Sequence, residues 1–225
     1  MDLETAERLC KLGGVIDALR WSTIHQIAFA DTQRCVDAVR AAARGQDGVA
    51  RVDQFWARAS IRAFFAGMEA LTFEMRLGLR QAIEARLHTL PLDEIPLLAD
   101  QMLELDATGT PKPRQRFIPI ERNFRFLFPR FAAMFGSKVT LDVADAGWND
   151  FTRTVKIRNR ITHPKSPQDL TLDAEDVSAA MRAISWYSEV MTSLIKELES
   201  LLGEAAARVT AETETIRRNT QNRLK

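Results

Sequence analysis

The sequence predicts an all-α fold, an antiparallel (up-and-down) helical bundle with an extra N-terminal helix. Ten glycines and eight prolines in 225 residues, with few runs of β-branched residues, favour helices over strands. Apolar residues recur at three- and four-residue spacing over long segments, the periodicity of amphipathic helices. Short polar loops separate these segments, which is typical of antiparallel bundles.

The first helix is expected from about Leu9, because residues such as Leu12 and Ile27 continue one apolar stripe. Gly13 and Gly14 weaken its first turns, by about 1 kcal/mol each relative to alanine. The turn-rich residues 44–49 close this segment.

The second helix has the clearest pattern in the chain. Its apolar residues alternate at steps of three and four up to about His88, and Pro91 ends it; they are Ile61, Phe64, Met68, Leu71 and Met75. A short acidic helix over 92–105 is expected next, followed by a loop over 106–114.

Three further helices complete the pattern. An aromatic helix over 118–135 is expected to kink or restart at Pro129. Residues 148–162 form the next helix, which Pro164 ends, and Asp173 caps the last long helix. The expected organisation is an N-terminal helical extension packed on the bundle (1–50), the bundle (51–202) and a polar helical tail (203–225).

Composition narrows the class of protein. The formal net charge is +1, which excludes a histone-like polycation. Two cysteines cannot build a disulfide framework, and neither lies near a second thiol or a histidine at metal-ligand spacing. The acidic start lacks the layout of a signal peptide, and no apolar run is long enough for a membrane span. We therefore expect a cytoplasmic protein.

The helix over 148–162 carries the candidate chemistry. At about 100° per residue, Trp148, Phe151 and Val155 form one apolar ridge. Three polar residues, Arg158, Asn159 and His163, flank this ridge and are expected at its buried edge. Lys156, Arg160 and Arg153 are expected to point to solvent. Because burying a guanidinium without a partner is costly, the three flanking groups require an explanation.

The run from Arg158 through Asn159 to His163 and Pro164 resembles the motif of the HEPN superfamily (higher eukaryotes and prokaryotes nucleotide-binding domains). In that motif an arginine and a polar residue precede a histidine. Residues 172–177 and the helix containing Trp186 resemble the end of such a domain, and residues 62–71 resemble its early core helix. The resemblance covers residues 51–202.

This resemblance implies a metal-independent endoribonuclease of the toxin or antiviral-defence kind. His163 is implied to transfer protons, Arg158 to stabilise the extra charge of the transition state, and Asn159 to orient Arg158 or the phosphate. Because one chain supplies one such histidine, a homodimer with a composite site is implied. The implied products carry 2′,3′-cyclic phosphate and 5′-hydroxyl ends, and an antitoxin or regulatory protein is a further partner to consider.

Family members often carry an acidic residue on an earlier helix, and Glu69 is the candidate here; the alternative is a surface salt bridge with a nearby arginine. A tyrosine that some toxin members carry two residues after the histidine is replaced by Lys165.

Two other functions remain open at this stage. One is a non-catalytic HEPN-like module that binds RNA, a nucleotide or a protein. The other is a structural helical protein in which Arg158 and Asn159 form an internal polar cluster and His163 caps the helix.

Charge is unevenly distributed along the chain. Residues 111–130 hold six basic side chains and one acid, and residues 151–167 hold five basic side chains and no acid. If the two segments are adjacent, they form a positive surface for RNA. The expected RNA-binding residues are Lys112, Arg114, Arg116, Arg122, Arg125, Lys156, Arg160 and Lys165.

Overall fold

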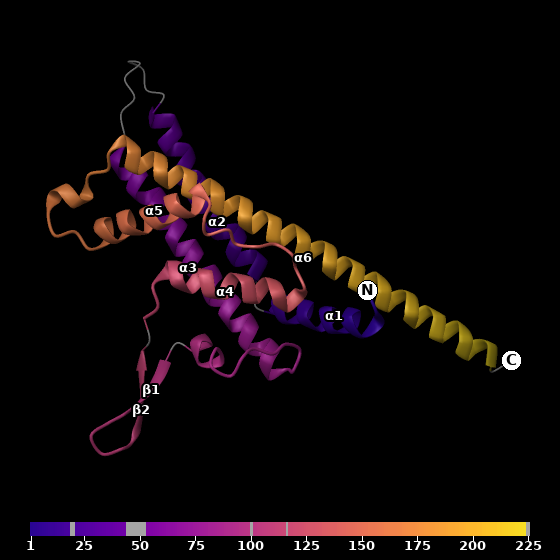
Figure 1. The fold of residues 1–225 in the computed structure, drawn as a ribbon. Coiled ribbons are helices and arrows are strands. Elements are labelled where there is room, and N and C mark those ends of the chain that lie inside the picture. Colours follow the sequence, from indigo (N-terminus) through magenta and orange to yellow (C-terminus); the bar gives the residue numbers. More distant parts are fainter. Residues whose placement is uncertain (19–20, 44–52, 100, 116, 224–225) are drawn as a thin grey trace.

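The computed structural model describes residues 1–18, 21–43, 53–99, 101–115 and 117–223. Within these ranges the chain is an all-α bundle with one small β-hairpin, as Figure 1 shows, so the predicted fold class is confirmed. The elements, in chain order, are α1 (Leu3–Ala18), α2 (Trp21–Ala43), α3 (Gln54–Glu84), η1 (Ile95–Leu98), β1 (Gln101–Leu105), β2 (Pro111–Gln115), α4 (Ile120–Phe135), α5 (Ala146–Thr162), η2 (Pro167–Leu170) and α6 (Ala174–Arg223).

The N-terminal segment forms two helices, α1 and α2, where the periodicity predicted one. Residues 19–20, between these two helices, and the predicted turn over 44–49 lie outside the described residues. Leu12 is buried as predicted, but Ile27 of α2 is 60% exposed, so it does not continue the predicted apolar stripe. Gly13 allows close approach of α6, since a Cβ atom there would lie 3.3 Å from Leu202 Cδ2.

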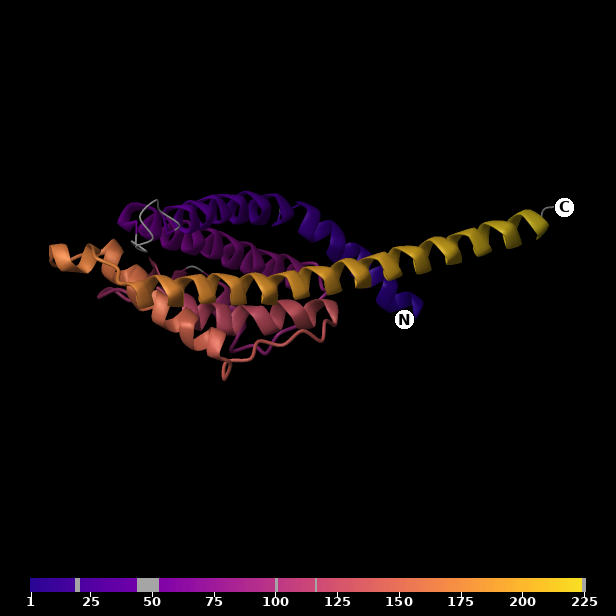
Figure 2. The ribbon, with the colours of Figure 1, turned by 90° about the horizontal axis from the view of Figure 1, so that it is seen from above.

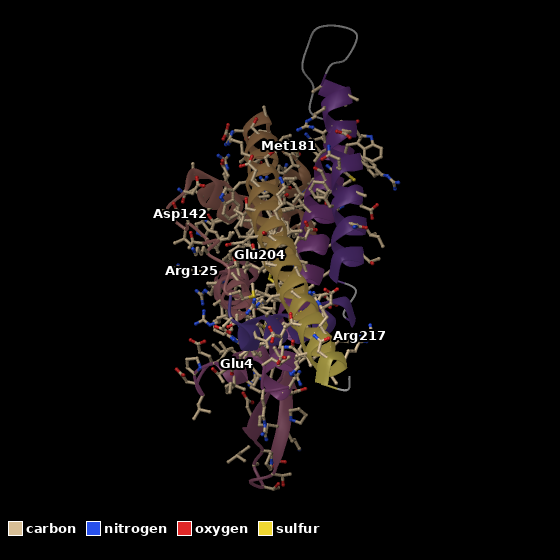
Figure 3. All side chains as sticks on the ribbon, turned by 90° about the vertical axis from the view of Figure 1, so that its right-hand side faces the viewer. Glu4, Arg125, Asp142, Met181, Glu204 and Arg217 are labelled. Carbon is tan, nitrogen blue, oxygen red and sulfur yellow. The ribbon has the colours of Figure 1, made fainter. Side chains whose placement is uncertain are left out.

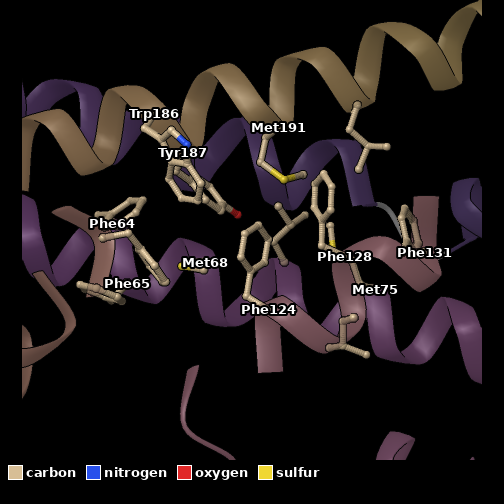
Figure 4. Close-up of a cluster of buried hydrophobic side chains, with 14 of the residues drawn as sticks. Phe64, Phe65, Met68, Met75, Phe124, Phe128, Phe131, Trp186, Tyr187 and Met191 are labelled. Atoms are coloured by element: carbon tan, nitrogen blue, oxygen red, sulfur yellow. The ribbon is translucent and has the colours of Figure 1, made fainter. Parts of the chain in front are cut away.

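The core lies between α3, α4, α5 and α6 (Figure 4). All five residues of the predicted stripe of α3 are buried, and so are four of the five phenylalanines of α4, while Phe126 is partly buried. Phe64 and Phe124 both contact the ring of Tyr187, with centroids 5.3 and 5.5 Å away.

Helices α1 and α2 belong to the same core. Ala6, Leu9 and Leu12 of α1 and Val36 and Val39 of α2 are buried in it. Figure 2 shows α2 lying along α3, and α6 crossing above the seam where α3 meets α4 and α5. Apolar side chains of α1 and α2 are therefore buried against the other helices.

The long helix α6 begins where predicted. Asp173 Oδ1 accepts a hydrogen bond from the Asp176 amide at 2.7 Å. The helix runs without a break through Gly203 to Arg223. Its C-terminal part extends beyond the other helices (Figure 2), and most of its described side chains there are exposed.

The predicted acidic helix over 92–105 is wrong. That segment contains η1 and then β1, which pairs antiparallel with β2. The predicted loop over 106–114 is partly wrong too, because β2 begins at Pro111 and only residues 106–110 form the turn. Pro111 and Pro113 argue against a strand in the sequence. Asp106 organises the turn of this hairpin by accepting hydrogen bonds from the amides of Thr108 (2.9 Å) and Thr110 (3.0 Å), and Gly109 supplies the positive φ of 78°.

Helix α4 passes through Pro129 without a break. It ends at Gly136, whose φ of 75° is the left-handed conformation that glycine adopts without strain.

Candidate functional site

Helix α5 is fixed by its apolar ridge. Trp148, Phe151 and Val155 are buried, as predicted. The ring of Phe151 lies between Phe65 and Trp186, with centroids 6.0 and 5.9 Å away. This packing holds α5 in the core along its length, and Ile161 in its last turn is also buried.

Arg158 pairs with Glu69, so the structure brings the predicted supporting acid to the motif. The Arg158 Nη2 atom lies 2.5 Å from Glu69 Oε1. A second guanidinium nitrogen, Nη1, donates to Asn159 Oδ1 at 3.2 Å. The Arg158 side chain is 25% exposed, and its Cζ atom lies 5.9 Å from the centre of the Phe65 ring. Arg158 is therefore held by an acid, an amide and an aromatic face.

Asn159 and His163 are exposed, which corrects the prediction that they lie at a buried edge. The last turn of α5 still contacts the core through Ile161, which is 1% exposed, but the face that is buried at Val155 opens to solvent four residues later. His163 is the C-cap of α5, and its amide donates to the Asn159 carbonyl at 3.0 Å.

Polar side chains of α3 fix the chain around His163. Arg62 Nη2 donates to the Ile161 carbonyl at 2.9 Å, and Arg58 Nη1 donates to the Leu170 carbonyl at 2.8 Å. Gln54 makes two hydrogen bonds of 2.8 Å with the backbone of Leu172. The exposed His163 therefore lies in a segment whose backbone is hydrogen-bonded to side chains of α3 both before and after it.

Two adjoining cavities meet at the motif. Both are lined by Phe117, Arg158, Asn159 and His163; one has a volume of about 670 Å³ and the other about 580 Å³. The larger extends along α3 and the start of α4, and the smaller runs towards Lys165 and Asp169. The motif residues form the wall that the two cavities share.

Several residues of the larger cavity were not predicted from the sequence. Thr72, Phe73 and Arg76 continue the face of Glu69 along α3 at helical spacing, and this spacing is the signal that could have identified them. Partial burial lowers the pKa of Arg76 below its usual range. Asn123 of α4 lines the same cavity and is 6% exposed.

Phe117 is the other residue that the sequence did not single out. It is 88% exposed and lines both of these cavities. Phe117 lies just after the hairpin and belongs to no periodic apolar pattern. Because the hairpin was not predicted, the sequence did not indicate that Phe117 lies near the motif.

The structure separates the predicted RNA-binding residues into three groups. Lys165 and Arg160 line the smaller cavity, and Arg122 lines a third cavity that also includes Phe117. Arg125 and Lys156 are exposed and line none of these three cavities.

Two more lie on the hairpin, where acids accompany them. Lys112 Nζ lies 2.9 Å from Asp106 Oδ2, and Arg114 Nη1 lies 2.8 Å from Glu104 Oε1. Arg116 lies outside the described residues.

Arg160 and Arg153 were predicted to point to solvent, but each forms an ion pair with an acid. Arg160 Nη2 lies 2.6 Å from Asp176 Oδ2, and Arg153 Nη1 lies 3.1 Å from Glu175 Oε1. Both acids belong to the first turn of α6, so these pairs fasten α5 to α6. The positive charge of the segment over 151–167 is thus partly neutralised by acids that are close only in the folded chain.

Within the described ranges, no group of three or more histidine, cysteine, aspartate or glutamate side chains is placed to hold a metal ion. None of the described helices is long and apolar enough to cross a membrane. No family model, curated protein or solved structure matches the chain.

Proposed function

We propose that this chain is a metal-independent endoribonuclease, a cytoplasmic toxin or antiviral-defence effector that acts as a homodimer and uses no cofactor. The observation that carries the proposal is the grouping of Arg158, Asn159 and His163 on the shared wall of two open cavities, with Glu69 of the larger cavity paired to Arg158. An arginine held by an acid beside an exposed histidine is a suitable arrangement for phosphodiester cleavage.

Arg158 would bind the scissile phosphate. A guanidinium offers a planar fork of donors to phosphate oxygens and stabilises the charge that they gain in the transition state. The contacts to Glu69 and Asn159 use one nitrogen each and orient the guanidinium before RNA arrives. Glu69 acts here as a positioning residue.

His163 would transfer the protons. One imidazole removes the proton of the ribose 2′-hydroxyl, whose oxygen attacks the phosphorus. The bond to the 5′-oxygen breaks, and this oxygen takes a proton from a second imidazole. His163 of a second copy would supply that group, since one described chain brings one histidine to these cavities. The products are a 2′,3′-cyclic phosphate and a 5′-hydroxyl.

Aromatic side chains support an RNA substrate. Phe117 and Phe73 are 88% and 47% exposed and line the larger cavity beside Arg158. Exposed aromatic rings stack on unpaired bases without requiring one base type. We therefore expect a single-stranded substrate.

The second candidate function is a HEPN-like module that binds RNA, a nucleotide or a protein without turnover. The ion pairs of Lys112, Arg114 and Arg160 favour it, because they reduce the charge available to hold a long RNA. A binding module would retain RNA affinity in the His163→Ala variant and show no cleavage in either form.

The test is incubation of end-labelled single-stranded RNA with the wild type and with His163→Ala, each with and without EDTA. We expect cleavage by the wild type in EDTA, a loss of about a hundredfold or more in the variant, and cyclic-phosphate ends. Arg80→Ala is the matched control, since Arg80 is exposed on α3 and pairs with Glu84. Cleavage that EDTA abolishes, or that survives loss of His163, contradicts the proposal.

A further inference from the structure

The β-hairpin has one apolar face that no other described element covers. Figures 1 and 3 show the hairpin projecting from the bundle. Because side chains alternate along a strand, Leu103 and Leu105 share one face. They are each 73% exposed and pair with Pro113 and Pro111, which are exposed too.

The opposite face is polar and internally paired. Arg114 and Glu104 form an ion pair on it, next to the pair of Lys112 with Asp106. The hairpin is therefore amphipathic, although only two strands form it. An isolated two-stranded sheet is marginally stable in water, so such an apolar face indicates a partner.

The two outer edges of the hairpin differ in their hydrogen-bonding groups. The Asp106 amide donates to the Thr110 carbonyl at 3.0 Å, so the even-numbered residues of β1 form the hydrogen-bonded pairs. The backbone groups of Leu103 and Leu105 then point away from β2. The corresponding groups of β2 belong to Pro111 and Pro113, which have no N–H.

Prolines therefore protect the outer edge of β2, whereas the outer edge of β1 keeps its donors and acceptors. Proline on an edge strand is a common means of preventing strand addition. Protection of one edge alone leaves β1 as the place where another strand can add.

We infer that β1 pairs antiparallel with β1 of a second copy of this chain, with Leu103 opposite Leu103 on the twofold axis. Charge favours this register. A shift that places Glu104 opposite Glu104 sets like charges against each other, which destabilises a strand pair. With Leu103 on the axis, Glu104 lies opposite Met102, and the leucines of the two copies lie side by side on the apolar face.

The strand that adds to β1 belongs to a second copy of the chain. In a twofold interface the same strand edge of both chains is paired, so each copy covers the exposed edge of the other. This inference rests on the proposed function in one respect: the composite site needs His163 from two chains. Phe117 follows β2 closely in the chain and lines the cavities at the motif, so the hairpin stands next to the site that the second copy would complete.

The test is sedimentation equilibrium of the wild-type chain and of Leu103→Pro and Leu105→Pro. Each proline removes an outward N–H and leaves the pairs between β1 and β2 intact. We expect a wild-type dimer at micromolar concentration and a dissociation constant raised about tenfold or more in both variants. Leu103→Val keeps the N–H and an apolar side chain, and should remain dimeric; helical circular dichroism verifies the fold of each variant.

A monomeric wild type at 100 micromolar (roughly the upper limit of a useful interface) overturns the inference. Dimers that survive both prolines overturn it too, because they must form through another surface. The RNA assay separates this result from the proposed function. If the dimer depends on the hairpin but cleaves no RNA, the inference holds and the proposed function is wrong. If the chain cleaves RNA but its dimer is unaffected by the prolines, the proposed function holds and the inference is wrong.

Discussion

The Glu69 carboxylate on α3 lies 2.5 Å from the Arg158 guanidinium on α5, across 89 positions of sequence. Both side chains are partly exposed on the wall of the larger cavity. Glu69 and Asn159 each accept one N–H of the Arg158 guanidinium, and its other N–H groups are left for a ligand, so the main role of the Glu69 contact would be orientation rather than stability.

Glu69→Gln is expected to lower the rate of RNA cleavage about tenfold to a hundredfold, with little change in KM, because Arg158 loses the partner that orients it. The unfolding free energy should change by less than about 1 kcal/mol, since partly exposed ion pairs contribute little. Single-turnover kinetics and urea unfolding measure the two effects. Glu84→Gln, which removes a surface pair with Arg80, is the control and should change neither. Equal losses in both variants would exclude an orienting role.

Gly147→Ala is expected to destabilise the fold. A Cβ atom at Gly147 would lie 2.1 Å from the Trp186 ring, so α5 or the indole must shift, at a cost of about 1–3 kcal/mol. Gly203→Ala is the matched comparison, because a Cβ atom there meets nothing within 4 Å, and alanine favours the helix by about 1 kcal/mol. Urea midpoints should therefore move in opposite directions. If both urea midpoints move in the same direction, the contact with Trp186 does not decide the effect of Gly147→Ala.

Glu74→Gln is expected to stabilise the protein at neutral pH. Glu74 is 8% exposed, its Oε2 atom has no hydrogen-bond partner among the described residues, and burial raises its pKa. A carboxyl group whose pKa is raised by folding favours the folded state below its ordinary pKa of about 4.3, and this contribution is lost as the pH rises through the raised value.

The variant should therefore gain about 1 kcal/mol at pH 7 and little at pH 4. Urea unfolding at both pH values checks this, with Glu84→Gln as an exposed control on the same helix. A gain that is equal at both pH values would contradict an effect of charge.

Arg130→Lys is expected to loosen the segment that carries the hairpin. Arg130 makes bidentate hydrogen bonds to Glu94 at 2.5 and 2.6 Å and lies 4.0 Å over the Phe126 ring, and lysine cannot reproduce this fork. Amide hydrogen exchange should accelerate at Leu97 and Ala99, whose amides bond within η1, and stay unchanged in α5. Arg80→Lys is the control. Unchanged exchange at η1 would mean that apolar contacts alone hold this segment.

The periodic helices were predictable because burial requires one apolar face at helical spacing. Phe64 and Met68 of α3, and Phe128 and Phe131 of α4, are buried as their spacing predicts. The hairpin was not predictable, because the prolines of β2 argue against a strand until the direction of each N–H is known. The exposure of Asn159 and His163 was missed because periodicity identifies a helical face but not the point where the core beneath it ends.

By itself, the sequence determined the all-α class, the order of the long helices from α3 to α6, and the grouping of Arg158, Asn159 and His163 at the end of α5, since these depend on local spacing. The tertiary structure alone decided which acids neutralise which basic residues, because Asp176 and Glu69 reach Arg160 and Arg158 only through packing. It also decided that the motif forms the wall of two cavities with Phe117. Contacts between residues far apart in the chain depend on how whole helices pack, and no local pattern encodes them.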